Sequence, residues 1–504
     1  MLKRVMISDF EHFQPSLRKE TLDTIKEFGF NTPTEVQKVV IPAFLDRKDV
    51  IVQSQTGSGK TLSFLIPLFE IIKRERESIE KKEVYGIIIS PTRELAHQIY
   101  DIAKIFCKHF NMTIGLLTGG IDMSTLEEEM KKGANIVVGT AGRIEEVIVN
   151  KLFELEWNNV EVLILDEGDR MIEMGFSQSM TRIICHLPKQ RRTGLFSATM
   201  PKELNKFVIA GCRNPYKIQI SNDNTLTPIS LANEYCIVPY EIKMQTLIRV
   251  LKESKDKKIV VFVLTCDQVD YIYNIIKILH QEGYLKEKEI YSIHGKVKQI
   301  NRDKVIKKFE ESCEAILICT DVLARGMDFD NINYIIQYDP PQDPKTYIHR
   351  VGRTARMGSI GHSLIFLGTL EKSFILLMEK KNVKIIERTI ERNEEEEKEY
   401  FNKIREICCK NRTVFKKSQN AFVSFCKGYG EHQCKYIFAI KKLVYNEVAK
   451  GMCLVKMPKI QEVKRMGIKY EEEMSIEENE IPFADERLEQ QRQERGKKRK
   501  EKGV

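Results

Sequence analysis

The sequence predicts two α/β domains in tandem, each built on a doubly wound parallel sheet, followed by a mostly helical C-terminal region. Three observations predict this class. Short β-branched apolar runs alternate with longer helical segments, the alternation occurs twice along the chain, and the strand-like runs stop beyond about residue 385. Runs that are apolar throughout suit parallel strands covered by helices on both faces. Their alternation with helices is typical of α/β sheets.

The alternation divides the chain into five segments. Strand-like runs lie at residues 49–54, 84–90, 135–139 and 161–165, and again at 258–264, 289–292, 315–320 and 333–338. Helical patterns lie between them, for example at 61–76 and 93–109, and beyond the last run at 399–409 and 435–449. We therefore predict a first domain at 1–218, a polar linker at 219–229, a second domain at 230–384, a helical extension at 385–470 and a charged, mobile tail at 471–504.

The composition is that of a globular protein. Of the 504 residues, 42% are hydrophobic and 30% are charged, which excludes wholesale disorder and a fibrous repeat. No apolar run approaches the roughly 20 residues of a membrane span, and the N-terminus lacks the apolar segment of a secretory signal. We therefore expect a soluble intracellular protein with no membrane partner. The 81 basic and 72 acidic residues leave a net charge of +9, which permits nucleic-acid binding without establishing it.

The cysteines predict no disulfide framework and no structural metal. The chain has 12 cysteines and no Cys-x-x-Cys pair, so in an intracellular protein they are expected to be reduced thiols. The tightest grouping, Cys426 with His432 and Cys434, matches no common zinc spacing.

A phosphate-binding loop is predicted where the first strand meets the first long helix. Residues 54–61 read Ser-Gln-Thr-Gly-Ser-Gly-Lys-Thr. Gly57 and Gly59 allow backbone N–H groups to approach phosphate oxygens at the helix N-terminus. Lys60 is placed to reach the β- and γ-phosphates, and the Thr61 hydroxyl to bind Mg²⁺. A chance Gly-Lys-Thr in a turn is the alternative, and the flanking strand and helix argue against it.

Two adjacent carboxylates follow the strand-like run at 161–165. Asp166 and Glu167 open the tetrapeptide Asp-Glu-Gly-Asp. Carboxylates at the end of a buried strand are costly unless a cation or a proton meets them. Asp166 is therefore expected to hold Mg²⁺, and Glu167 to orient or deprotonate an attacking water. A solvated pair that caps the next helix is the alternative, which the phosphate loop upstream makes the weaker one.

A cluster of arginines lies in the second domain. Residues 349–356 read His-Arg-Val-Gly-Arg-Thr-Ala-Arg. Arginines presented by a neighbouring domain stabilise charge on a transferring phosphoryl group, an effect of ~10³–10⁵ in rate where it has been measured. A salt-bridged surface helix is the alternative. The cluster favours a protein in which closure of the two domains and hydrolysis are coupled.

The order of the motifs points to a family. They are GFNTPTEVQ at 29–37, SQTGSGKT at 54–61, PTRELA at 91–96, TGG at 118–120, TAGR at 140–143, DEGD at 166–169, SAT at 197–199, TD at 320–321, ARGMD at 324–328 and HRVGRTAR at 349–356. In this order they resemble the DEAD-box ATP-dependent RNA helicases, over about residues 8–370. The resemblance implies two RecA-like lobes that close around ATP, Mg²⁺ and single-stranded RNA, and that unwind short duplexes locally.

The resemblance also implies roles for individual residues. The ATP site would comprise Phe10 (with Phe13 as its rival) beside the adenine, Thr32 and Gln37 at the adenine edge, Ser54, Gln55, Thr56, Gly57, Ser58, Gly59, Lys60 and Thr61 around the triphosphate, Asp328 at the ribose, and Arg353 and Arg356 as arginine fingers. The catalytic residues would be Lys60, Asp166, Glu167, Arg353 and Arg356, with Thr61 and Asp166 as Mg²⁺ ligands. Asp169, Ser197, Thr199 and His349 would couple hydrolysis to unwinding.

The same comparison implies an RNA path. It would comprise Pro91, Thr92, Arg93, Gly119, Gly120, Thr140 and Arg143 in the first lobe and Thr320 in the second. His294, Lys296 and Arg302 stay open between RNA contacts and a solvated basic face. Because such contacts mostly touch the RNA backbone, we expect weak sequence preference.

Three positions depart from the family pattern. Gly168 replaces Ala in the tetrapeptide that names the family, which keeps both carboxylates and is expected to leave a looser turn. Ala141 replaces Pro, which removes a fixed φ from an RNA-contacting loop. Ser54 replaces Ala, a small polar change that we expect to be tolerated.

The region after the second lobe narrows the family. Residues 411–429, 449–459 and 481–483 are similar to the C-terminal extension of nucleolar DEAD-box proteins, above all the large-subunit assembly subgroup first named for suppression of a poly(A)-binding-protein defect. This similarity implies residence in the nucleus and nucleolus, and action on ribosomal RNA in precursors of the large (60S) subunit. The implied partners are ribosomal RNA precursors and pre-60S particle proteins, with a monomer outside the particle.

Two features of this region stay open. Basic residues Lys410, Arg412, Lys416 and Lys417 adjoin Phe415, Phe422 and Phe425, as in an RNA- or protein-docking helix, but aromatics at helical spacing favour a core. The basic residues 495–502 suit a nuclear localisation signal, a phosphate-binding arm or a solvated charged end equally well.

Other functions fit the same motifs. An ATP-gated RNA clamp, an assembly platform whose hydrolysis only controls release, would carry an identical set. A DEAD-box helicase of another RNA pathway would share the core, although the C-terminal extension argues against it. A DNA helicase is a weaker third reading, which dependence on the RNA 2′-hydroxyl would decide.

Overall fold

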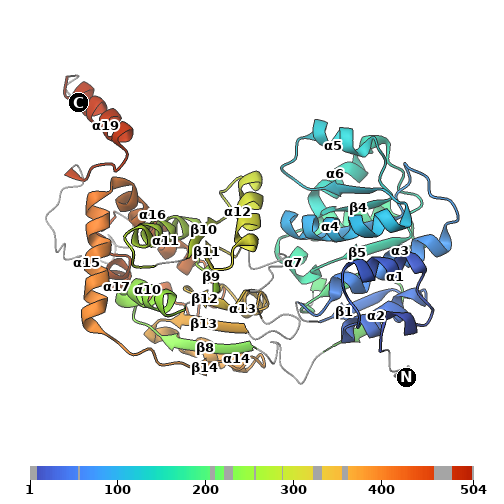
Figure 1. Cartoon of the computed structure of the whole chain (residues 1–504), viewed down its shortest axis with the longest axis horizontal. Helices are drawn as coiled ribbons and strands as arrows, with labels where there is room; N and C mark the ends of the chain where they lie inside the picture. Colours follow the sequence, from blue (N-terminus) through green and yellow to red (C-terminus); the bar gives the residue numbers. More distant parts are fainter. Residues whose placement is uncertain are drawn as a thin grey trace. The chain divides into compact units, whose positions relative to one another are not determined.

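The computed structural model describes residues 8–54, 57–201, 203–204, 211–220, 231–254, 257–285, 288–321, 332–354, 361–458 and 480–501 (Figure 1). These residues divide into two compact units, one before and one after the predicted linker. Most of that linker lies outside the described residues. So do four predicted site residues: Gln55, Thr56, Asp328 and Arg356.

The first unit is built on a seven-stranded sheet in which every pairing is parallel. Its strands are β1 (Val50–Gln53), β2 (Gly86–Ser90), β3 (Ile114–Leu117), β4 (Ile136–Thr140), β5 (Val162–Leu165), β6 (Arg192–Ser197) and β7 (Tyr216–Gln219). Their order is β3-β4-β2-β5-β6-β1-β7. The connections that leave the neighbouring strands β1 and β6 run in opposite directions, to β2 and to β7, and ligands of doubly wound sheets bind at the carboxyl ends of strands near such a point.

Helices cover both faces of this sheet. The helices are η1 (Phe10–His12), α1 (Lys19–Glu27), α2 (Glu35–Leu45), α3 (Lys60–Glu75), α4 (Arg93–Phe110), α5 (Met123–Met130), α6 (Ala141–Val149), η2 (Leu152–Glu154), α7 (Gly168–Glu173) and α8 (Ser177–His186). Alternate residues of one strand enter different cores: Val50 and Val52 pack with α2, α3 and α4, whereas Ile51 packs with α6 and α8. Because successive side chains of a strand point to opposite faces of the sheet, each strand contributes to two hydrophobic cores.

The second unit repeats the plan with another seven-stranded parallel sheet. Its strands are β8 (Leu231–Ile237), β9 (Lys258–Phe262), β10 (Glu289–Ile293), β11 (Ala315–Cys319), β12 (Tyr334–Gln337), β13 (Gly361–Leu367) and β14 (Ile386–Glu387), in the order β10-β11-β9-β12-β13-β8-β14. Its helices up to β14 are η3 (Tyr240–Ile242), α10 (Lys243–Glu253), α11 (Cys266–Gln281), α12 (Gln299–Glu311), α13 (Pro344–Val351), η4 (Thr369–Glu371) and α14 (Ser373–Glu379). The predicted fold class is confirmed.

The strand-like runs predicted eight of the 14 strands in the described part of the chain. All eight predicted runs form strands, whereas β3, β6, β7, β8, β13 and β14 were not among them. The edge strand β7 buries only Ile218, and β8 alternates buried with exposed residues, so neither carries a continuous apolar run. Strands are expected to stop beyond about residue 385, and the last strand of the described residues, the two-residue β14 that pairs with β8, lies at this bound.

The C-terminal extension packs on the second unit. It comprises α15 (Glu394–Lys410), α16 (Arg412–Gly430), η5 (Ile440–Lys442) and α17 (Tyr445–Gly451), and α16 lies along α11 (Figure 1). Phe415, Phe422 and Phe425 are buried, so the core interpretation of these aromatics is confirmed. The helix expected at 435–449 is wrong: Phe438 instead packs between Phe374 and Tyr429, and α17 begins only at Tyr445. Tertiary packing overrides local helix propensity there.

Part of the predicted mobile tail, residues 471–504, forms a helix. Helix α19 (Glu486–Glu501) follows a short segment in which Ile481 is buried. The backbone N–H of Arg412 donates to the Pro482 carbonyl at 2.7 Å, and the Arg412 guanidinium donates to the Ile481 carbonyl at 3.2 Å. These bonds attach residues 481–482 to the start of α16.

A buried histidine in the extension predicts a pH dependence of stability. Burial lowers the pKa of His432 to about 4, and its Nδ1 accepts a hydrogen bond from the Cys434 N–H while the ring lies on Phe438. Between pH 4 and 6.5 the unfolded chain therefore binds more protons than the folded one, so stability falls as the pH falls below 6.5. At pH 5 we expect a loss of up to about 2 kcal/mol relative to pH 7.

Chemical unfolding at the two pH values checks this expectation. His432→Gln should flatten the difference between pH 7 and pH 5, whereas His280→Gln, on α11, should leave it unchanged. An undiminished difference in the His432 variant would contradict this origin of the pH dependence.

Among the helices that the structure describes, none combines the length and the apolar character needed to cross a membrane.

Candidate functional site

The predicted phosphate loop lies between β1 and α3 at the carboxyl edge of the first sheet. Gly57 and Gly59 have φ values of 74° and 90°, in the left-handed region that favours glycine. A Cβ on Gly59 would lie 2.8 Å from both Thr34 Oγ1 and Gln37 Nε2, so the loop has no room for a side chain there. Lys60 Nζ donates to the Ser54 carbonyl at 2.9 Å, which keeps the ammonium group within the loop.

Gln37 connects the N-terminus of α2 to this loop. Its Nε2 donates to the Gly59 carbonyl at 3.2 Å, and its Oε1 accepts from the Thr34 N–H at 2.9 Å within a capping box. Thr32 lies exposed just before this cap. The structure therefore brings Gln37 and Thr34 to the phosphate loop from a separate segment of the chain, whereas no contact joins Thr32 to the described residues of the loop.

The two aromatic candidates for the adenine contact are both buried. Phe10 is 4% exposed and Phe13 is fully buried, with their ring centroids 5.9 Å apart in a stacked arrangement. Both rings belong to the core that includes α2 and α3. The two rings lie side by side in one core, so both Phe10 and Phe13 stay candidates for the adenine contact.

Asp166 and Glu167 emerge at the end of β5, the strand in the middle of the sheet. Burial, followed by the neighbouring Glu167 carboxylate, raises the pKa of Asp166 to about 7. Glu167 has a φ of 49°, an uncommon conformation for a side-chain-bearing residue, and its Oε2 is buried without a hydrogen-bond partner among the described residues. A cation or a bound water beside these two buried carboxylates would stabilise their charge and satisfy the Glu167 oxygen.

A hydrogen-bond network joins Asp169, the last residue of the acidic tetrapeptide, to the end of β6. Asp169 Oδ2 accepts from the Thr199 N–H at 2.9 Å and from the Thr199 hydroxyl at 2.7 Å. Ser197 Oγ accepts from the Asp169 N–H at 3.2 Å and donates to the Thr199 carbonyl at 2.7 Å. The Ser54 N–H donates to the Ser197 carbonyl at 3.1 Å. Predicted coupling residues therefore bond directly to the acidic motif and to the phosphate loop.

A second group of predicted residues gathers at the ends of β2, β3 and β4. Thr92, directly after Pro91, caps α4 by accepting from the Leu95 N–H at 3.3 Å, and Arg93 begins that helix. The Arg93 guanidinium lies against Gly119 and Gly120, where added Cβ atoms would lie 2.9 Å and 2.3 Å from its nitrogens.

Arg143 reaches the segment that follows these glycines. It donates to the Ile121 carbonyl at 3.4 Å and contacts Met123, and it lies in α6, which begins after Thr140. Two arginines from separate helices thus meet one loop.

In the second unit the arginine cluster divides between two environments. Arg350 is fully buried, forms a bidentate pair with Asp321 at 2.6 and 3.0 Å, and donates to the Asp339 carbonyl at 2.8 Å. Arg353 is 4% exposed and its Nε donates to the His349 carbonyl at 3.2 Å. Thr320, at the end of β11, has a buried hydroxyl without a hydrogen-bond partner among the described residues. Sequence reasoning missed the structural role of Arg350, because three arginines in one segment look alike.

Comparison with known proteins identifies the chain. Residues 34–207 match the family model for the DEAD/DEAH box helicase, 242–358 match the helicase conserved C-terminal domain, and 411–460 match the C-terminal extension of the ATP-dependent rRNA helicase SPB4-like family. The DEAD-box ATP-dependent RNA helicase 49 of Arabidopsis thaliana is 42% identical over 91% of this chain and 82% of its own length.

The chain belongs to the DEAD-box ATP-dependent RNA helicases.

Other relatives agree. Human ATP-dependent RNA helicase DDX55 is 37% identical over 98% of this chain and 83% of its own length. Among solved structures, Mss116p bound to ssRNA and AMP-PNP matches with a TM-score of 0.78 and 26% identity over 90% of this chain and 92% of that one. S. cerevisiae Dbp5 bound to RNA and ADP BeF3 matches with a TM-score of 0.65 and 27% identity over 77% of this chain and 97% of that one. The helicase is therefore an RNA-dependent ATPase with two RecA-like lobes.

The Gly168 departure has a local explanation in this helicase. A Cβ on Gly168 would lie 2.7 Å from Leu195 Cδ1 and 3.2 Å from Leu204 Cδ1. The Leu195 side chain thus occupies the space of the absent methyl group, and the expectation of a looser turn stays a prediction. Ala141, the second departure, is buried as the first residue of α6.

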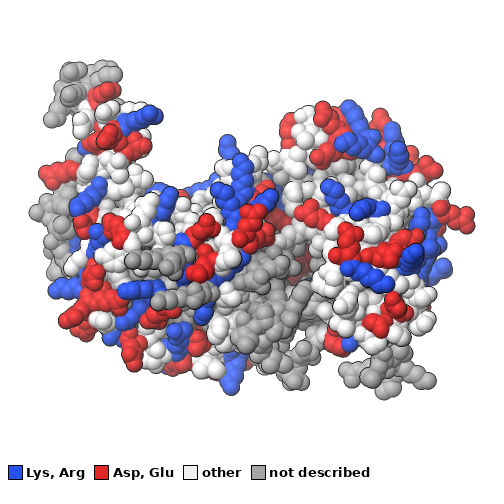
Figure 2. Space-filling model, viewed as in Figure 1, with Lys and Arg blue, Asp and Glu red and all other residues white. Residues whose placement is uncertain are grey.

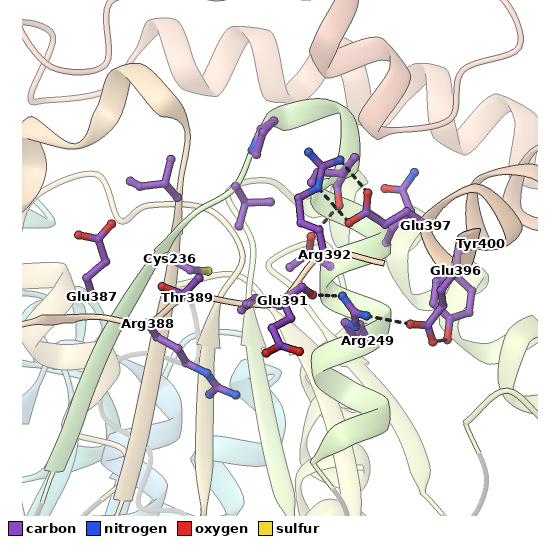
Figure 3. Close-up of a pocket in the computed structure, with 17 residues that line it drawn as sticks. Cys236, Arg249, Glu387, Arg388, Thr389, Glu391, Arg392, Glu396, Glu397 and Tyr400 are labelled. Atoms are coloured by element: carbon purple, nitrogen blue, oxygen red, sulfur yellow. Dashed lines mark hydrogen bonds and ion pairs between the residues drawn. The ribbon is translucent and has the colours of Figure 1, made fainter. Parts of the chain in front are cut away.

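A pocket of about 150 Å³ lies in lobe two, between β8, α10 and the segment that leads into α15 (Figure 3). Its arginines are paired within it or beside it. Arg249 bonds Glu396 at 3.2 Å, Arg392 bonds Glu397 at 2.8 Å, and Arg388 bonds Glu234 at 3.3 Å. The helicase therefore uses this region to attach its extension to lobe two.

Proposed function

We propose that this helicase remodels ribosomal RNA in precursors of the large ribosomal subunit. The match of residues 411–460 to an extension of rRNA helicases carries the proposal. The matched residues include α16 and α17, which pack on lobe two as part of one compact unit. On this proposal the protein works in the nucleus and nucleolus, as a monomer outside the particle, with pre-60S proteins as partners.

The proposed ATP site combines the residues that meet at the phosphate loop. Ser54, Gly57, Ser58, Gly59, Lys60 and Thr61 would bind the triphosphate, and Gln37, Thr32 and Phe10 would bind the adenine, together with Gln55, Thr56 and Asp328 and with Arg353 and Arg356 from lobe two. The diverging connections that leave β1 and β6 and the helix N-terminus of α3 support anion binding at this edge. Lys60 would release the Ser54 carbonyl to meet phosphate oxygens.

Mg²⁺ fits the acidic edge of this site. The unsatisfied buried oxygen of Glu167 and the raised pKa of Asp166 both indicate a place where positive charge is missing. Asp166 and the Thr61 hydroxyl would hold the ion, which neutralises charge on the phosphates when bound. Glu167 would accept the proton of the attacking water, and the Asp169–Ser197–Thr199 network would transmit the change to β6.

The proposed RNA surface of lobe one is tested at Gly120. Gly120→Ala is expected to weaken binding of single-stranded RNA about tenfold, because the new methyl group displaces the Arg93 guanidinium and strains a residue with a φ of 87°. Gly142→Ala is the matched control, since its Cβ would meet nothing within 4 Å. Fluorescence anisotropy with a labelled oligonucleotide measures both. Equal affinities of the two variants would remove this glycine loop from the RNA path.

Steady-state ATP hydrolysis is the first test of the activity. The purified protein is assayed alone, with single-stranded RNA and with matched DNA. Stimulation by RNA and not by DNA is expected of an RNA helicase, and the 2′-hydroxyl is the group by which a protein distinguishes the two. Equal stimulation by DNA would contradict an RNA-specific enzyme.

A second measurement tests which RNA pathway the protein acts in. Co-sedimentation of the protein with large-subunit precursors supports the proposal, whereas co-sedimentation with messenger particles alone would place it in another RNA pathway. Lys and Arg side chains gather over α12 of lobe two (Figure 2). If electrostatic contacts of this kind hold the RNA, its affinity should fall steeply as the salt concentration rises.

A further inference from the structure

A cluster of ionisable side chains lies in lobe two at the N-terminus of α11. Cys266 is the first residue of α11, a 16-residue helix whose N-cap, Thr265, forms a capping box with Gln268. His294, directly after β10, shares a hydrogen bond with the Cys266 sulfur, and its Nε2 lies 3.5 Å from Asp270 Oδ1. A cysteine, a histidine and an aspartate are thus aligned, each in reach of the next.

The contacts favour a charged sulfur. The hydrogen bond from His294 lowers the pKa of Cys266, with help from the Gly295 N–H and from Lys296. Hydrogen bonds to Asp270 and Cys266 raise the pKa of His294 to about 9. The helix N-terminus adds a positive field at the same sulfur.

The surrounding charges support this state. Asp267 is paired with Lys296 Nζ at 2.7 Å, and Lys417 of α16 acts on Asp270, so the extension contributes a positive charge. The Lys296 backbone N–H donates to His294 Nδ1 at 3.3 Å. A hydrogen bond of this length is weak, so it opposes protonation of Nδ1 only weakly. His294 is buried, whereas Cys266 is partly exposed to solvent.

We propose that Cys266 is a modification site that reacts with hydroperoxides. The sulfur attacks one peroxide oxygen, so that an S–O bond forms while the O–O bond breaks. Sulfur is oxidised by two electrons to a sulfenic acid, and the peroxide is reduced to the corresponding alcohol, or to water from hydrogen peroxide. The leaving oxygen takes its proton from the His294 imidazolium. The product carries no charge, so the charge-assisted contact between His294 and the sulfur is lost, at the start of the loop that Arg302 holds through the Gly295 and Val297 carbonyls.

Competition between cysteines of the same protein tests the proposal. Cys185 and Cys313 expose their side chains more than Cys266 does, so accessibility alone predicts that they react first. The full-length protein is treated with iodoacetamide at about pH 6.5, and each site is quantified by peptide mass spectrometry. We expect Cys266 to be alkylated about tenfold faster than either exposed cysteine, because its sulfur is ionised at lower pH. Equal or slower alkylation would overturn the proposal.

Oxidation and substitution sharpen the test. After brief exposure to hydrogen peroxide, a dimedone adduct should appear first on Cys266, and equal labelling of Cys185 would contradict the proposal. His294→Gln should slow alkylation of Cys266 about tenfold, whereas His280→Gln, at the opposite end of α11, should not. Circular dichroism verifies that both variants are folded, and the comparison among cysteines of the unmodified protein does not depend on them.

Discussion

Replacing Glu167 by glutamine is expected to lower RNA-stimulated ATP hydrolysis at least about 100-fold while ATP and RNA binding persist. The substitution is nearly isosteric, so the fold around β5 should be kept. The amide cannot accept a proton from water, and the buried position without a hydrogen-bond partner shows that no other group of the described chain uses Glu167 Oε2. Hydrolysis is measured in steady state, and binding by fluorescence of labelled nucleotide and RNA.

Glu173→Gln is the control for this prediction. Glu173 closes the same short helix, α7, and its carboxylate lies 3.7 Å from Arg170 at the surface side. The control should hydrolyse ATP normally. Unchanged turnover in the Glu167 variant would exclude this residue as the base.

The Glu167→Gln variant also distinguishes a helicase that must cycle through ATP hydrolysis from an ATP-gated RNA clamp. If the protein acts only as an ATP-gated RNA clamp, the Glu167 variant should stay bound to RNA and support its cellular role. If cycling matters, it should bind RNA and fail to support that role.

Gly451→Ala is expected to destabilise the second unit by about 1–3 kcal/mol, through overpacking between α17 and η3. A Cβ at Gly451 would lie 1.9 Å from the Tyr240 carbonyl oxygen and 2.9 Å from its carbon. Both atoms belong to backbone, which cannot turn aside as a side chain can. The extension must therefore shift away from lobe two, and thermal unfolding together with limited proteolysis of 394–451 measures the result.

Gly430→Ala is the matched control. Gly430 is the last residue of α16 as Gly451 is of α17, and its Cβ would meet Ile440 side-chain atoms only at 3.8 and 4.0 Å. An unchanged melting temperature is expected there. Equal behaviour of the two variants would show that the close approach of α17 to η3 does not hold the extension in place.

Local motifs predicted the glycine loop because its geometry depends on neighbouring residues. The loop lies between a strand and a helix N-terminus, and Gly59 has the left-handed φ that the motif requires. Continuous apolar runs predicted eight strands, among them the fully buried β2 and β9. They missed β6, which is buried but contains Arg192 and Gly194, and the edge strand β7, which buries only Ile218.

Side chains that meet from distant segments could not be predicted in this way. The Arg93 guanidinium lies on Gly119 and Gly120, and the Cys266 sulfur meets His294, because separate strands end at the same sheet edge. Arg350 and Arg353 lie three residues apart in one basic segment, and the structure shows Arg350 in a bidentate pair with Asp321, whereas the Arg353 Nε donates to the His349 carbonyl. Such distinctions depend on long-range packing.

The sequence by itself determined the two parallel α/β lobes, the phosphate loop and the acidic pair, since each depends on hydrophobic periodicity or on a few consecutive residues. Only the tertiary structure decided that Phe415, Phe422 and Phe425 are core, that 435–449 is not one helix and that Leu195 fills the space beside Gly168. The reason is that burial and close approach are properties of surfaces brought together by the whole fold, and no single segment contains both surfaces.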